Sequence, residues 1–64
     1  MEIVTPLEAA AALKLSVSTL NRLRMAGGGP VYRKYGRLVR YDLADLIEWS
    51  KNQARSNTSE HAAA

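Results

Sequence analysis

The spacing of apolar residues predicts a first helix near the N-terminus. Thr5 can accept a hydrogen bond as its N-cap, and Glu8 completes a capping box. The alanine run that follows favours helix, and we expect the helix to end near Leu13, before a tight turn. One face at helical spacing is expected to pack on the core, and it consists of Leu7, Ala10 and Ala11.

A second helix is predicted from about Val17 to Ala26. Ser16 is a residue type that caps helices, and Leu20 lies on the face that we expect to pack inward. Gly27 is a natural C-terminal stop, because glycine adopts the left-handed conformation freely. The further glycines after it predict a loosely held connection to the next element.

β-Branched and aromatic residues then predict two strands, at 31–35 and 38–41, joined by a turn at Gly36. Asp42 is expected to cap a third helix over about residues 43–53. The fold class is therefore mainly α with a small β-hairpin.

Residues 1–53 are expected to form one domain, and residues 54–64 a flexible C-terminal tail that includes His61. Ile3 and Val4 are expected to add a short strand beside the hairpin. No apolar run approaches the roughly 20 residues of a membrane span, and no signal peptide is visible. We therefore expect a soluble protein of the cytoplasm.

The composition limits the chemistry of the chain. Its 64 residues include no cysteine and one histidine, so neither a disulfide framework nor a Cys/His zinc site can be assembled. A domain of this size buries only about 60% of its unfolded surface, which leaves no room for a deep catalytic cleft. We expect no enzyme activity, because no nucleophile–base pair is present, and we expect no cofactor.

Basic charge is concentrated in the middle of the chain. No acidic residue occurs from Ala9 to Tyr41. That stretch holds Lys14, Arg22, Arg24, Arg33, Lys34, Arg37 and Arg40. Protein surfaces usually intersperse both signs, so this run favours a polyanion footprint over an ordinary solvated surface.

Two short helices joined by a tight turn form the motif that places its second helix in the major groove of DNA. With Leu20 inward, helical geometry directs the side chains of Val17, Asn21 and Arg22 outward. Asn and Arg suit bidentate contacts with adenine and guanine, and a helix N-terminus favours phosphate. The predicted DNA-binding residues of this helix are Ser16, Val17, Ser18, Thr19, Asn21 and Arg22. The alternative for them is an ordinary exposed helix surface.

The predicted hairpin supplies a second group of DNA-binding residues. Its basic side chains crowd around the turn, where like charges would repel unless a polyanion neutralised them. These predicted contacts are Arg33, Lys34, Gly36, Arg37 and Arg40.

Several other residues have open interpretations. Trp49 is expected to anchor the core, with a contact to a partner protein as the alternative. Tyr41 is expected to point into the core, whereas Tyr32 and Tyr35 could cover the core or stack on bases. Lys14 either contacts phosphate or is simply exposed.

Four segments together resemble the MerR-like and excisionase-like helix-turn-helix domains. They are Thr5–Ala10, Leu13–Leu20, Tyr35–Tyr41 and Asp45–Trp49, and the resemblance extends over roughly residues 3–51. It implies a winged helix-turn-helix, in which the hairpin is the wing.

The resemblance also implies roles for single residues. It puts Ser18, Asn21 and Arg22 at major-groove positions, and Arg37 and Arg40 at wing contacts. The chain departs from the family at Lys14, where glycine is common. If the left-handed turn is kept there, lysine costs about 1–2 kcal/mol.

The function implied by the resemblance is that of an excisionase from a phage or mobile element. Such a factor binds duplex DNA cooperatively with further copies of itself, bends the DNA and helps an integrase to excise. A small AlpA-like transcriptional regulator is the alternative, and a basic protein-interaction module is a more distant one. The long dimerisation helix and effector domain of MerR regulators are missing, so no small-molecule effector is expected.

Overall fold

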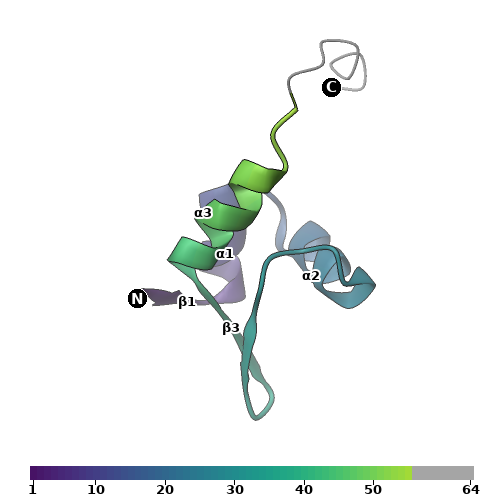
Figure 1. The fold of residues 1–64 in the computed structure, drawn as a ribbon. Coiled ribbons are helices and arrows are strands. Elements are labelled where there is room, and N and C mark those ends of the chain that lie inside the picture. Colours follow the sequence, from purple (N-terminus) through teal and green to yellow (C-terminus); the bar gives the residue numbers. More distant parts are fainter. Residues whose placement is uncertain (56–64) are drawn as a thin grey trace.

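The structure is a computed structural model that describes residues 1–55. Its elements in chain order are β1 (Ile3–Val4), α1 (Pro6–Leu13), α2 (Val17–Ala26), β2 (Arg33–Tyr35), β3 (Leu38–Asp42) and α3 (Leu43–Asn52). Figure 1 shows the β2–β3 hairpin extending away from the three helices. The predicted tail lies outside the described residues, apart from Ala54 and Arg55, and so does His61.

The strands form one small antiparallel sheet in the order β1-β3-β2. The short N-terminal strand lies beside the hairpin as predicted, with Val4 opposite Tyr41. In the hairpin, Arg33 pairs with Arg40 and Tyr35 with Leu38. The strand predicted from residue 31 begins only at Arg33, which lies opposite Arg40 and is the first residue of the hairpin to pair with β3.

Side chains cap all three helices where the sequence predicts it. The Thr5 hydroxyl accepts a hydrogen bond from the Glu8 N–H at 3.1 Å, and the Glu8 carboxylate accepts one from the Thr5 N–H at 2.9 Å. Ser16 accepts from the Thr19 N–H at the start of α2, and Asp42 caps α3. These local interactions determine where each helix begins.

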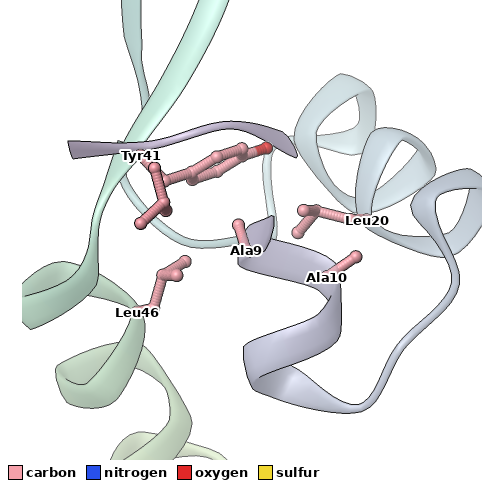
Figure 2. Close-up of a cluster of buried hydrophobic side chains, with 6 residues drawn as sticks. Ala9, Ala10, Leu20, Tyr41 and Leu46 are labelled. Carbon is pink, nitrogen blue, oxygen red and sulfur yellow. The ribbon is translucent and has the colours of Figure 1, made fainter. Parts of the chain in front are cut away.

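The core lies where α1, α2, α3 and the sheet meet (Figure 2). Its buried side chains are Val4, Ala9, Ala10, Leu20, Tyr41 and Leu46. The small side chains of Ala9 and Ala10 leave room for the Tyr41 ring and for Leu20 of α2 beside α1. The prediction that Tyr41 points inward is confirmed.

The predicted inner face of α1 is partly wrong. Ala10 is buried, but Leu7 is 69% exposed and Ala11 is also exposed. The side chains of this helix that pack inward are instead those of Ala9, Ala10 and Leu13, at i, i+1 and i+4 spacing. Trp49 is only half-buried and does not belong to the core cluster of the described residues, so the expectation that it anchors the core is wrong.

Two chain reversals use the left-handed backbone conformation. Gly36 has φ of 65° at the hairpin turn, as expected for glycine. Lys14 adopts φ of 60° between α1 and α2, so the left-handed turn is kept without glycine. This conformation costs about 1–2 kcal/mol for a residue with a Cβ atom.

Three helices with a small antiparallel sheet confirm the predicted mainly helical fold with a hairpin, which is consistent with a winged helix-turn-helix. In the part of the chain that the structure describes, no helix is both long enough and apolar enough to span a bilayer.

Candidate nucleic-acid interface

The turn before α2 is held by backbone hydrogen bonds. The Lys14 N–H donates to the carbonyl groups of Ala10 and Ala11, and the Leu15 N–H donates to Ala10 at 2.8 Å. Ser16 then caps α2, which starts at Val17. The N-terminus of α2 therefore has a defined position, and its positive dipole end is suited to a phosphate.

The exposed face of α2 carries the predicted base-reading residues. Ser18, Arg22 and Met25 are exposed at one-turn spacing, and Asn21 is half-exposed. In residues 1–55 the Arg22 guanidinium makes no ion pair. Asn21 and Arg22 thus keep polar groups that could contact base edges.

Three other predicted residues of α2 have structural roles at its start. Val17 is partly buried and packs against the core, so the expectation that it projects outward is wrong. Its position one turn before Leu20 turns it toward the same interior. The Ser16 hydroxyl donates to the Thr19 hydroxyl at 2.9 Å, so both groups take part in the cap. Their contact with DNA stays a prediction.

Arg24 points to the interior side of α2, unlike Arg22. Its guanidinium lies 5.6 Å from the centre of the Tyr32 ring, within the range of a cation–π interaction. It also faces the Tyr41 hydroxyl from α2. Burial raises the pKa of Tyr41, and the nearby Arg24 opposes this shift only in part. Among the residues that the structure describes, neither the Arg24 Nε nor the Tyr41 hydroxyl has a hydrogen-bond partner of good geometry.

The hairpin presents free basic side chains near its tip. Lys34 and Arg37 are exposed on either side of Gly36 and make no ion pair within the described part of the chain. Arg40 is half-buried, and its Nη1 donates to the Val39 carbonyl at 2.7 Å. These side chains remain suited to phosphate contacts.

Arg33 differs from the other basic residues of the hairpin. Its Nη2 lies 3.5 Å from Asp42 Oδ2 and 3.8 Å from Asp45 Oδ2. The expectation that the basic charges around Gly36 need a polyanion to neutralise them is therefore wrong for Arg33, which two carboxylates of the chain itself neutralise. The strand register places Arg33 directly opposite Arg40, and the two carboxylates offset the resulting repulsion.

The glycine connection between α2 and β2 is held on both sides. The Trp49 indole N–H donates to the Gly28 carbonyl at 3.1 Å. A Cβ atom on Gly29 would lie only 3.0 Å from the Leu23 Cβ, so the backbone passes very close to α2 there. Pro30 is buried. The expectation of a loosely held connection is wrong, because these contacts attach it to α2 and α3.

Sequence reasoning missed the α3 residues that hold this region. Asp45 and Trp49 contact residues far away along the chain, and only their spacing of one helical turn gave a signal. Residues 1–55 contain no group of three or more His, Cys, Asp or Glu arranged to hold a metal ion.

Comparison with known families places the chain among proteins of matching architecture. The family model described as "Helix-turn-helix domain" matches residues 3–54, which include every helix and strand of the structure. Comparison with curated proteins finds no match.

Proposed function

This chain belongs to the helix-turn-helix domain family of small DNA-binding proteins, and from that premise we propose that it reads duplex DNA in a sequence-specific manner. In this proposal α2 enters the major groove and the β2–β3 hairpin acts as a wing on the adjacent backbone. The protein acts by binding, not by catalysis.

The main support for the proposal is that the segment between α2, with its exposed face, and the hairpin, with its basic tip, is held in place by contacts with α2 and α3. Asn21 and Arg22 are the proposed base readers, with Ser18 at the helix N-terminus. Lys34, Arg37 and Arg40 are the proposed phosphate contacts. Together they would touch two adjacent surfaces of one duplex.

Nuclease footprinting on a library of duplexes tests this role. A protected stretch at a preferred sequence supports DNA reading. The absence of an ordered footprint at any sequence would instead favour a basic module that docks an acidic protein.

Within this role we favour an excisionase-like architectural factor that bends DNA and assists an integrase. The resemblance of residues 3–51 to excisionase-like helix-turn-helix domains supports this role. An AlpA-like transcriptional regulator that uses the same surface is the second candidate. Either role would place the protein in the cytoplasm of a bacterial or phage-infected cell.

A circular-permutation assay on the preferred site separates the two candidates. A bend, together with increased excision when a cognate integrase is added, supports the architectural factor. An unbent complex with no effect on excision would leave the regulator.

A further inference from the structure

We infer that one face of α3 positions the wing for DNA binding, through an ion pair from Asp45 to Arg33 and a hydrogen bond from Trp49 to Gly28. This inference rests on the proposed DNA-binding function and assigns residues outside the proposed contact surface to it. Asp45, Trp49 and Arg33 are positioning residues, because they act through the placement of the contact residues.

The geometry of α3 brings both contacts to one place. Asp45 and Trp49 are four residues apart, so their side chains lie one above the other on the same helix face. Asp45 Oδ2 lies 3.8 Å from Arg33 Nη2, and Trp49 Nε1 lies 3.1 Å from the Gly28 carbonyl oxygen. The face therefore attaches the connecting segment near both of its ends.

The attached segment, residues 28–33, joins α2 to the wing. Its path therefore sets how the hairpin lies relative to the exposed face of α2. Gly29 packs tightly against Leu23 in α2, which transmits the position of the segment to that helix. Loosening either attachment would let the wing change its angle while the helices stay folded.

The surroundings of Arg33 distinguish it from a phosphate contact. Two carboxylates lie within 4 Å of its guanidinium, and one of them, Asp42, is 7% exposed. Asp42 is itself held by N–H groups of Glu2 and Ala44. Arg33 is therefore tied to a rigid anion at the base of the wing, whereas Arg37 at the tip makes no ion pair with any residue from 1 to 55.

The first test compares two variants that each remove one acidic charge from α3. Asp45→Asn removes the ion pair from α3 to Arg33 and leaves the Arg33–Asp42 pair in place. Glu48→Gln is the matched control because Glu48 is exposed and makes no ion pair within residues 1–55. We expect Asp45→Asn to weaken binding to the preferred duplex by about two- to fivefold, the range of a partly exposed ion pair. Glu48→Gln should leave binding unchanged or strengthen it, since a lost negative charge favours a polyanion.

The second test measures the salt dependence of binding for Arg33→Gln and Arg37→Gln. The logarithm of the binding constant falls linearly with the logarithm of the salt concentration. Losing a phosphate contact reduces the steepness of this fall by about one. We expect Arg37→Gln to show this change. Arg33→Gln should weaken binding with the slope unchanged, which a residue touching phosphate would not do.

Circular dichroism at the assay temperature confirms that each variant is folded. Trp49→Phe provides a second test, because it keeps an aromatic side chain but replaces the indole with a smaller ring that has no N–H. We expect Trp49→Phe to weaken binding severalfold with an unchanged salt slope. Equal strengthening by Asp45→Asn and Glu48→Gln, or a lowered slope for Arg33→Gln, would overturn the inference while DNA binding stands. A wild-type chain that binds no duplex would overturn the proposed function and the inference together.

Discussion

Among the single residues of this small protein, Tyr41 and Arg24 place polar atoms in its interior. The Tyr41 ring fills the centre of the core, yet its buried hydroxyl has no hydrogen-bond partner of good geometry. Arg24 faces that hydroxyl and stacks near Tyr32. Such a hydroxyl adds little to stability, whereas the ring that carries it is essential to packing.

The first prediction concerns Tyr41→Phe. Near neutral pH the free energy of unfolding should change by no more than about 1 kcal/mol, because the ring stays and the lost hydroxyl makes no hydrogen bond of good geometry within residues 1–55. Burial raises the folded-state pKa of Tyr41 above its unfolded value near 10. The neutral phenol therefore contributes fully below pH 10, and stability is lost as the pH rises through the folded-state pKa.

Urea unfolding at a series of pH values from 8 to 11 checks this prediction. The wild-type chain should lose stability more steeply than Tyr41→Phe at the alkaline end. Parallel curves for the two proteins would show that the phenol is not buried as described.

A second prediction at this scale concerns Lys14→Gly. Glycine relieves the left-handed conformation of residue 14, although it also gains freedom in the unfolded chain. The net result should be a gain of roughly 0.5–1 kcal/mol, seen as a higher midpoint of thermal unfolding. Lys14→Ala is the control, since it keeps the Cβ atom and should bring no such gain. The salt slope of Lys14→Ala also decides whether Lys14 contacts phosphate.

At the scale of elements, α2 and the hairpin are expected to contribute differently to DNA binding. Asn21 and Arg22 are on a helix suited to the major groove, where base edges differ from one pair to the next. Arg37 is on a hairpin tip, where phosphates look the same at every sequence. The exposure of these side chains does not distinguish the two roles. The chemistry of the DNA surface that each would contact, base edges or phosphates, does.

The third prediction follows from this division of roles. Asn21→Ala or Arg22→Ala should cost about 1–3 kcal/mol on the preferred duplex and much less on random duplex. Arg37→Ala should weaken both by the same factor and lower the salt slope by about one. Titrations of both duplexes at several salt concentrations measure these quantities. Equal losses on both duplexes for the Asn21 and Arg22 variants would refute their role as base readers.

At the scale of the whole molecule, the sequence predicts local features well and distant contacts poorly. The caps at Thr5, Ser16 and Asp42 and the turn at Gly36 depend on neighbouring residues, so the sequence indicates them directly. The attachment of Gly28 to Trp49 joins residues 21 positions apart and leaves no local pattern.

In the candidate site, too, the sequence predicts local features but not contacts between distant residues. The exposure of Arg22 and Arg37 could be predicted from helical spacing and the hairpin turn. The ion pairs of Arg33 could not, because they depend on the strand register and on where α3 packs. The inner face of α1 was predicted only in part, since the helix turns Ala9 and Leu13 inward beside Ala10 and leaves Leu7 exposed.

The fourth prediction tests the packing between elements and concerns Gly29→Ala. The new Cβ atom would lie 3.0 Å from the Leu23 Cβ, so the connection must shift away from α2. We expect a loss of about 1 kcal/mol or more in the free energy of unfolding, as in other overpacked sites. Gly28→Ala is the matched control, because nothing lies within 4 Å of its Cβ position. Chemical denaturation of both variants measures the difference, and equal stabilities would contradict the close approach at Gly29.

The hairpin has a further dependence on the start of the chain. The Glu2 N–H donates to Asp42, the Leu43 N–H donates to the Glu2 carbonyl at 2.8 Å, and Val4 pairs with Tyr41. Residues 2–4 thus hold the C-terminal end of β3 in place at the base of the hairpin. We therefore expect a fusion tag, a protease cut or a recoded start site at these N-terminal residues to disturb DNA binding, although they lie far from α2 and the hairpin tip in the sequence.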